Sequence, residues 1–378
     1  YTLARRDHHL FTSVAWGGLI LDEAQKIKNP EIQVTQAVNR IPADFRLALT
    51  GTPIENQLEE LWSIFNFLNR GYLGSQMTFR KQFAYPIERY HDPVTTARLQ
   101  RMVRPFILRR LKSDPNVIQD LPERLEMKVY CTLTDEQAEL YRAIVEEALP
   151  RVRDLHGRAR RIHIFNLLTR LKQVLNHPVQ YLAKTPIDAN HIPDEPLARR
   201  SGKLDRLVEM LEEVLAVGDR ALIYTQFAET GYLLVAHLQQ QFDIPVLYLH
   251  GGVPARQRQQ MIAEFQENPH APPLFVLTLK TGGLGLNLTA ANHVFHYDRW
   301  WNPAVEDQAS DRAYRIGQLR NVQIHKFITA GTVEEAIDAL IERKQGLLDT
   351  IVGADESWLA DLSDEELAEL VSLSQERV

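Results

Sequence analysis

Short apolar runs alternate along the chain with stretches in which apolar residues recur at helical spacing. The runs that predict strands cover residues 16–21, 47–49, 126–133, 221–224, 246–249, 274–277, 293–297 and 323–328. Between them, apolar residues three and four apart predict helices, among them residues 58–68, 164–175, 204–215 and 256–265. Strands that alternate with helices predict an α/β fold with parallel sheets, whose functional residues lie where the strands end.

Several predicted helices begin at residues that can satisfy free main-chain amides. Three pairs have the spacing of a capping box: Thr134 with Gln137, Thr332 with Glu335, and Ser363 with Glu366. The last pair opens a short amphipathic helix in an acidic tail. We expect this helix to dock on the body of the protein through Leu367, Leu370 and Val371.

Composition narrows the class of protein. With 378 residues, 44% hydrophobic and 24% charged, the chain is long enough for two or more soluble globular domains. Its one cysteine, Cys131, excludes an internal disulfide and fits a reducing compartment. No apolar run approaches the roughly 20 residues that span a membrane. We expect a cytoplasmic protein, associated with the nucleoid if the source is prokaryotic.

The formal net charge of −6 excludes a bulk polycation, so any contact with DNA must rest on local basic strips. Residues 104–112 form one such strip, either a surface rim or a phosphate contact. Residues 151–161 contain five arginines and form another. We interpret the second strip as a solvated helical loop, with DNA contact as the alternative.

An acidic pair, Asp22 and Glu23, closes the first apolar run. A strand that ends in two carboxylates is the Walker-B arrangement, in which the first acid holds magnesium and the second orients the attacking water. The alternative is a strand followed by a solvated acidic turn. The next apolar run leads into Thr50, Gly51 and Thr52, which precede a proline.

Residues 278–318 combine glycines, tryptophans and arginines. Gly282, Gly283 and Gly285 follow the run at 274–277, and a segment from Asp298 to Pro303 with two tryptophans follows the run at 293–297. Because proline suits the first helical position, we predict a helix from Pro303 that carries Gln308, Arg312 and Arg315. Arginines three residues apart on a helix share one face and can reach the same anion. The alternative is a solvated arginine face, and we expect at least one tryptophan to pack internally.

Together and in this order, the acidic pair, the Thr-Gly-Thr-Pro loop and residues 278–318 resemble helicase motifs of the Swi/Snf-type family of DNA translocases, in helicase superfamily two. The resemblance covers residues 16–348. It implies two RecA-like lobes with parallel sheets, the first truncated, plus helical protrusions. The implied segments are the C-terminal part of the first lobe (1–62), its helical protrusion (63–110), the inter-lobe connection (111–133), a helical protrusion with linker (134–199), the second lobe or helicase C-terminal domain (200–330) and a helical extension (331–378).

The resemblance also implies ATP and Mg²⁺ as cofactors. Asp22 would hold magnesium through water, Glu23 would activate the attacking water, and Arg312 and Arg315 would be arginine fingers that reach the phosphates when the lobes close. Further residues implied at the nucleotide are Gln308, Gly283 and Gly285. Thr50, Gly51 and Thr52 would couple the nucleotide site to lobe movement.

On the DNA side, the family's loops lie along the duplex backbone. The matching residues are Thr225, Gln226, His250, Gly251, Lys280, Thr281, Gly282, Trp300 and Asn302. Glycine amides, a lysine and small hydroxyls suit phosphates and read no bases. We therefore expect sequence-independent, salt-sensitive binding to double-stranded DNA, with a DNA-bound protein as a further partner.

The family's glycine-rich lysine loop is absent. No G-x-x-x-x-G-K-[ST] occurs, and beside Lys203 the residues Leu197 and Leu204 stand where such a loop needs glycine and a hydroxyl. We expect a fragment that lacks the start of the first lobe and is inactive alone. For the longer protein, we expect a DNA-stimulated ATPase that translocates on duplex DNA and displaces or remodels bound protein. The alternatives are a strand-separating DNA or RNA helicase and a non-enzymatic nucleic-acid-binding remnant.

Overall fold

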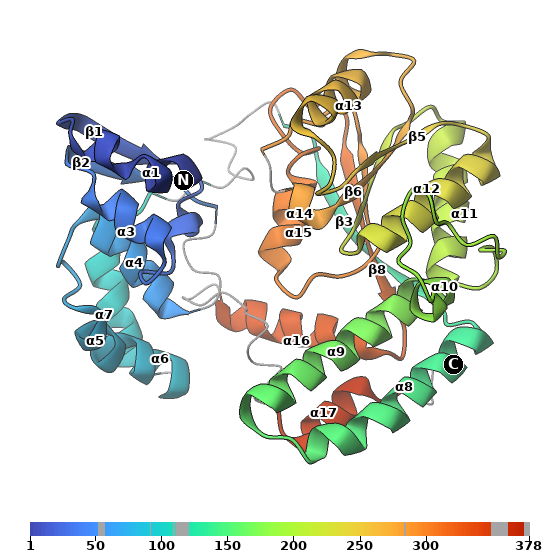
Figure 1. Ribbon diagram of the computed structural model, residues 1–378, viewed down its shortest axis with the longest axis horizontal. Coiled ribbons are helices and arrows are strands. Elements are labelled where there is room, and N and C mark those ends of the chain that lie inside the picture. The colour runs from blue at the N-terminus through green and yellow to red at the C-terminus, as the bar shows by residue number, and fades with distance from the viewer. Residues whose placement is uncertain are drawn as a thin grey trace. The chain divides into compact units, whose positions relative to one another are not determined.

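The computed structural model describes residues 1–51, 57–90, 92–108, 110, 121–282, 285–348 and 362–373. The chain divides into two compact units (Figure 1): unit 1 comprises Tyr1–Leu111 with Glu342–Glu356, and unit 2 comprises Lys112–Ile341 with Ser357–Val378. Each unit contains a parallel sheet, which confirms the predicted α/β class. None of the helices in these described ranges combines the length and apolar content that crossing a bilayer requires.

In unit 1, β1 (Trp16–Leu21) pairs in parallel with β2 (Ala43–Ala48). Short helices flank the strands: α1 (Thr2–Arg6), α2 (His8–Thr12), η1 (Ala24–Ile27) and α3 (Gln33–Arg40). β2 begins ahead of the predicted apolar run, because its main chain already pairs with β1 at Ala43, Phe45 and Arg46. The strands meet closely at Gly18, where a Cβ would collide with the ring of Phe45.

A helical layer completes unit 1. It comprises α4 (Leu58–Leu68), α5 (Gln76–Phe79), the π-helical η2 (Arg80–Ala84), α6 (Tyr85–Tyr90), α7 (Pro93–Val103) and η3 (Arg104–Phe106). α4 has the predicted bounds, and Leu58, Leu61, Trp62 and Phe65 are buried in one core with residues of α5, η2, α6 and α7. The apolar stripe of α4 is therefore core.

The sheet of unit 2 has six parallel strands in the order β3-β8-β7-β4-β6-β5. Their bounds are β3 (Arg124–Cys131), β4 (Ala221–Thr225), β5 (Val246–Leu249), β6 (Leu274–Thr278), β7 (His293–His296) and β8 (Val322–Thr329). The helices that follow strands or precede them are α11 (Gly202–Ala216), α12 (Ala228–Phe242), α13 (Ala255–Glu267), α14 (Leu279–Gly282) and α15 (Pro303–Ser310).

Both faces of this sheet are covered. Along β4, Ala221 and Ile223 pack in a core with residues of α11 and α12, whereas Leu222 and Tyr224 pack in a second core with residues of α13 and α15. Figure 1 shows α11 and α12 on the opposite side of the sheet from α14 and α15. Successive strand residues point to opposite faces, so a strand buried on both sides is apolar at most positions.

A helical body belongs to the same unit. Its elements are α8 (Asp135–Arg153), α9 (Gly157–Asn176), α10 (Pro178–Leu182), the part of α16 (Val333–Leu348) up to residue 341, and α17 (Asp364–Val371). The capping boxes at Thr134 and Ser363 are confirmed. α17 docks as predicted, with Leu367, Leu370 and Val371 buried in a core with α8 and α9.

The predicted capping box at Thr332 is wrong in its pairing. The Thr332 hydroxyl accepts from the amide of Glu334 at 3.2 Å, whereas the Glu335 carboxylate accepts from the amide of Gly331 at 2.8 Å. Because the chain turns at Gly331, with φ at 71°, the Gly331 amide meets the Glu335 carboxylate in place of the Thr332 amide.

Candidate functional site

Asp22 and Glu23 follow directly after β1, at its carboxyl end. Glu23 has a left-handed backbone, with φ at 52°, and its amide donates to the Asp22 carboxylate at 2.9 Å. The Tyr1 hydroxyl donates to the Asp22 carbonyl at 2.6 Å, and burial raises the pKa of Tyr1 to about 12. A non-glycine residue in this backbone region costs about 1–3 kcal/mol, and such strain clusters at functional sites.

Gln25 joins the acidic pair to the loop after β2. Its Nε2 donates to Oε2 of Glu23 at 2.6 Å, and its Oε1 accepts from the Thr50 hydroxyl at 2.7 Å. Thr50, predicted to couple nucleotide site and movement, is thus connected to Glu23 through one side chain. Gly51 is exposed beside it, and Thr52 lies outside the described residues.

These groups fit a magnesium nucleotide. The Asp22 side chain is exposed at the strand end and offers hard carboxylate oxygens. Magnesium is usually bound by one or two carboxylates together with waters and substrate phosphates. Within the described ranges, no group of three or more His, Cys, Asp or Glu residues is placed to hold a metal. The exposed Asp22 carboxylate thus fits a magnesium ion whose other ligands are waters and phosphate oxygens.

In unit 2, the predicted DNA-contacting residues follow neighbouring strands. Thr225 and Gln226 come at the end of β4, His250 and Gly251 after β5, Lys280 to Gly282 after β6, and Trp300 and Asn302 after β7. Because β7, β4, β6 and β5 are adjacent and parallel, the structure brings these loops to one edge of the sheet. Gly251 and Lys280 are exposed there.

Several of these side chains are engaged within the protein. The Thr281 hydroxyl is buried and donates to the Thr278 carbonyl at 2.7 Å. Asn302 accepts from the amide of Ala304 at 3.0 Å and so caps α15. Burial lowers the pKa of His250, which favours its neutral form. Lys280 is therefore an exposed charged side chain among the residues predicted to contact DNA at this edge.

Asp298, directly after β7, is fully buried and holds the loop after β4. Its Oδ2 accepts from the Thr225 hydroxyl at 2.6 Å and from the side-chain Nδ2 of Asn176 at 2.9 Å, and its Oδ1 accepts from the main-chain amide of Gln226 at 2.9 Å. Burial raises the pKa of Asp298, and the nearby Lys203 ammonium opposes that rise. The Thr225 hydroxyl is thus a support for its loop.

Lys203, in the Ser-Gly-Lys segment, is a structural residue. It is 1% exposed and pairs with Glu334 at 2.5 Å, and its ammonium also donates to Oδ1 of Asn176 at 3.3 Å. A buried ion pair at the start of α11 agrees with the sequence-based rejection of this segment as a phosphate-binding loop.

Lys172, one helical turn before Asn176 on α9, holds the loop after β7. It is 2% exposed, and its ammonium donates to the Arg299 carbonyl at 2.9 Å and to Oε1 of Gln226 at 3.5 Å. The same ammonium lies 3.7 Å from the centre of the Trp301 ring. Two residues of α9, four apart on one face, therefore support two of the predicted DNA-contacting loops.

The two tryptophans differ. Trp301 is buried in the core of the helical body, which confirms the expectation that at least one packs internally. Trp300 is half-buried, and its amide donates to Glu306 at 2.7 Å. Arg299 is buried with Glu306 and Asp338; burial opposes its charge, but the two carboxylates outweigh burial and raise its pKa.

The prediction that Arg312 and Arg315 share one helical face is wrong. α15 ends at Ser310, because the chain beyond it bonds to a different segment. The Leu288 amide donates to the Arg312 carbonyl at 2.9 Å. Arg312 is 7% exposed, whereas Arg315 is exposed and donates to the Leu286 carbonyl at 3.2 Å. Gln308 is on α15 as predicted and half-buried.

Of the glycines predicted at the nucleotide, Gly285 has φ at 67°, which favours glycine, and Gly283 lies outside the described residues. Sequence reasoning missed the supporting roles of Lys172, Asn176 and Asp298. A signal existed for the first two, since both interrupt the apolar face of a helix and are buried there. Buried polar residues at helical spacing indicate a partner, but the sequence does not name it.

Two family models match successive parts of this chain. Residues 1–180 match the family described as SNF2-related domain, and residues 202–317 match the helicase conserved C-terminal domain. The putative ATP-dependent helicase/translocase YwqA of Bacillus subtilis is 45% identical over 99% of this chain and 40% of its own length. The TATA-binding protein-associated factor MOT1 of Saccharomyces cerevisiae is 33% identical over 98% of this chain and 22% of its own. The chain thus spans less than half of these relatives.

Two solved structures agree. The Sulfolobus solfataricus SWI2/SNF2 ATPase core in complex with dsDNA is 41% identical, with a TM-score of 0.57 over 99% of this chain and 76% of that one. The SWI2/SNF2 ATPase core domain of the same organism matches with 41% identity and a TM-score of 0.58, over 96% of this chain and 72% of that one. Their RecA-like lobes account for the parallel sheets seen in both units. By sequence and by fold, this chain belongs to the SWI2/SNF2 ATPase family.

Proposed function

We propose that the full-length protein carrying this chain is a DNA-stimulated ATPase that translocates on double-stranded DNA and displaces or remodels bound protein. The observation that carries the proposal is the 41% identity to a SWI2/SNF2 ATPase core that was solved with dsDNA. The relative MOT1 is named as a TATA-binding protein-associated factor, which supports a protein as cargo.

At the nucleotide, unit 1 contributes the acidic pair. Asp22 would hold magnesium through water, and the ion would neutralise phosphate charge. Glu23, held by Gln25, orients the attacking water. From unit 2, Arg312 and Arg315 supply positive charge to the phosphates during hydrolysis. Both units are therefore required for turnover.

At the DNA, the strand-end loops of unit 2 contact backbone phosphates. Lys280 supplies a charge, and main-chain amides in the glycine-containing loops supply hydrogen bonds. Such contacts read no bases, so binding is independent of sequence and weakens as salt is added. The variant Lys280→Gln should reduce the salt slope of duplex binding by roughly one unit.

The test measures ATP hydrolysis by the full-length protein with and without duplex DNA. We expect duplex to stimulate hydrolysis, and Glu23→Gln to lower the rate by about 100-fold or more while ATP binding persists. Glu31→Gln, an exposed glutamate in the same unit, is the matched control and should have no effect. A duplex-stimulated rate that survives Glu23→Gln would refute the assigned role.

A second assay separates translocation from strand separation. A triplex-forming strand is placed on duplex, and its release is compared with unwinding of a forked duplex by the same protein. We expect ATP-dependent release of the third strand without unwinding. Unwinding of the fork would favour a helicase, and the absence of any ATP hydrolysis would favour a non-enzymatic binding module.

A further inference from the structure

The hairpin of α8 and α9 carries a local excess of positive charge. Residues 141–170 contain seven arginines and three acidic residues, a formal net charge of +4, whereas the whole chain carries −6. Arg151, Arg153, Arg158 and Arg161 are exposed. Arg160 pairs with Asp364 of α17 at 2.9 Å and is therefore already engaged. The four exposed arginines form a basic surface on a protein whose net charge is negative.

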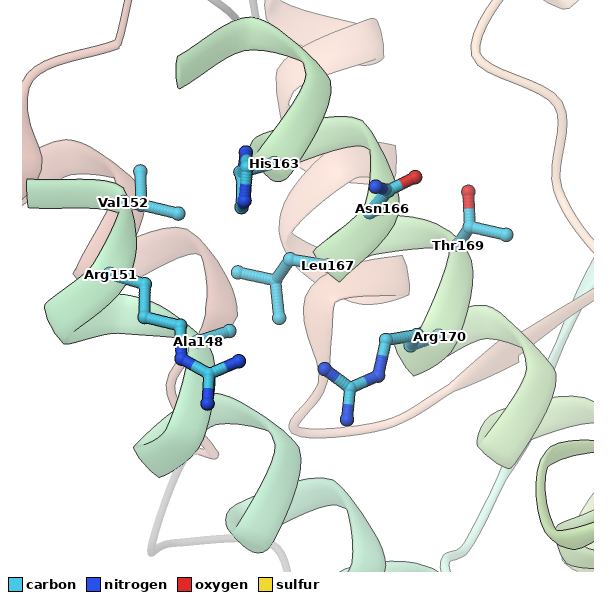
Figure 2. Close-up of a pocket in the computed structure, with 8 residues that line it drawn as sticks. All are labelled: Ala148, Arg151, Val152, His163, Asn166, Leu167, Thr169 and Arg170. Atoms are coloured by element: carbon cyan, nitrogen blue, oxygen red, sulfur yellow. The ribbon is translucent and has the colours of Figure 1, made fainter. Parts of the chain in front are cut away.

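A pocket of about 330 Å³ opens between the two helices (Figure 2). Its floor is apolar, formed by Ala148, Val152 and Leu167, and its polar lining is Arg151, His163, Asn166, Thr169 and Arg170. Figure 2 shows the guanidinium groups of Arg151, from α8, and Arg170, from α9, extending toward each other at the pocket. None of these lining residues is a carboxylate, and Glu147 lies beside the pocket and bonds to both arginines.

One carboxylate beside the pocket orients both arginines. Glu147 accepts from Nη1 of Arg151 at 3.0 Å and from Nη2 of Arg170 at 2.7 Å. Arg170 is also held by Tyr181, whose hydroxyl accepts from the same Nη2 at 2.8 Å and whose ring lies 5.6 Å from the guanidinium. Each arginine thus uses one terminal nitrogen for these bonds, and within the described residues its other nitrogens carry no hydrogen bond.

We propose that this pocket and the exposed arginines around it form a second contact with the phosphate backbone of duplex DNA, separate from the strand-end loops of unit 2. A guanidinium offers a planar fork of donors that matches phosphate geometry. Two such groups, oriented in advance, lose little side-chain entropy when a phosphate binds. Exposed arginines along the same hairpin extend the contact to neighbouring phosphates, as a basic strip on an acidic protein does.

The inference rests on the proposed function, because it assumes that the full-length protein binds duplex DNA. The experiment measures duplex affinity across a salt series for the wild type, for the double variant Arg151→Gln with Arg170→Gln, and for Arg206→Gln. Arg206 is the matched control: it is an exposed arginine of α11 that pairs with Glu209 at 2.8 Å, outside the hairpin. Thermal unfolding of each variant checks that the fold is kept.

We expect the double variant to bind duplex about tenfold more weakly at low salt, with a salt slope shallower by about one to two units, while Arg206→Gln matches the wild type. A double variant with unchanged affinity and slope overturns the inference. If Lys280→Gln lowers the slope in the same series, duplex binding through the loops still stands and only the second contact fails. If the wild type binds no duplex, the proposed function fails with it.

Two further arms identify the anion. Calorimetric titrations with inorganic phosphate and with poly-glutamate test a free phosphate ion and an acidic polypeptide as the ligand. If the double variant no longer binds phosphate or poly-glutamate while its salt slope for duplex is unchanged, the pocket is assigned to the probe whose binding is lost, and the DNA contact is overturned. Weak or absent binding of both probes, together with a shallower duplex slope, supports it.

Discussion

Lys172 is the side chain whose loss should separate DNA response from basal chemistry. Lys172 is 2% exposed, and its ammonium donates to the Arg299 carbonyl at 2.9 Å and lies 3.7 Å from the Trp301 ring centre. It supports the loops that carry Gln226 and Trp300, both predicted to lie at the DNA. Its contacts with Gln226, Arg299 and Trp301 are all within unit 2, and the acidic pair lies in unit 1. The variant Lys172→Met keeps the length of the side chain and removes only the charge.

The magnitude follows from the contacts. A hydrogen bond from a charged group contributes about 1.5–3 kcal/mol, and a desolvated cation–π contact contributes about 2 kcal/mol. Burying an ammonium opposes these gains, and methionine avoids that cost. The Arg299 carbonyl keeps a donor in the variant, since Nε2 of Gln226 also bonds to it. We therefore expect a net loss of about 2 kcal/mol in the stability of unit 2, with the loops less well fixed.

The assay compares ATP hydrolysis by the full-length protein across a duplex titration. For Lys172→Met we expect the duplex-stimulated rate to fall by about tenfold, with the unstimulated rate within about twofold of the wild type. Lys184→Met, at an exposed lysine of the same unit, is the control. A double-mutant cycle with Trp301→Phe should give a coupling of about 1 kcal/mol in urea unfolding. Normal duplex stimulation in a measurably destabilised Lys172→Met would refute the supporting role.

Three further perturbations test separate parts of the structure. Thr50→Val removes the hydroxyl that donates to Gln25 and should lower hydrolysis by about tenfold with ATP affinity unchanged, measured by steady-state kinetics and nucleotide titration. Burial lowers the pKa of His177 to about 4, so protonation of the unfolded chain below pH 6.5 favours unfolding; stability should fall from pH 6.5 toward pH 4, and His177→Gln should remove about 2 kcal/mol of that loss at pH 5, measured by urea unfolding. Gly202→Ala places a methyl group on a main-chain carbonyl and should cost about 3 kcal/mol in the same assay, whereas Gly251→Ala, with open space around it, should cost far less.

Apolar patterning predicts the strands of this protein well, because strands buried on both faces are apolar at most positions. β4 and β6 are fully buried and appear in the sequence as unbroken apolar runs. β2 is different: it includes the polar residues Asp44 and Arg46, and only its pairing with β1 defines where it begins. Where a strand begins at polar residues, its first residue is determined by pairing with the partner strand. The local sequence carries no information about that pairing.

Some residues of the candidate site can also be predicted from the local sequence, whereas others depend on distant contacts. The positions of the acidic pair and the loop residues are predictable because each lies within a few residues of the end of an apolar run. The arginine pair is misplaced because the helix from Pro303 ends at Ser310, where the Arg312 carbonyl bonds to the Leu288 amide. Helical spacing in the sequence cannot report a main-chain bond made to a segment more than 20 residues away, as here.

The residues that sequence reasoning missed share a physical property: each is a buried polar group whose partners lie far along the chain. Asn176 meets Asp298 at 2.9 Å across a separation of 122 residues, and Lys172 meets the Arg299 carbonyl across 127. A buried charge without such partners would cost several kcal/mol, so these groups are retained only where the fold supplies every bond. In this protein the bonds converge on the loops after β4 and β7. Because of that convergence, α9, a helix outside the sheet, holds the loops at the sheet edge. Substitution of Lys172 on this helix should therefore alter the DNA response more than the basal chemistry.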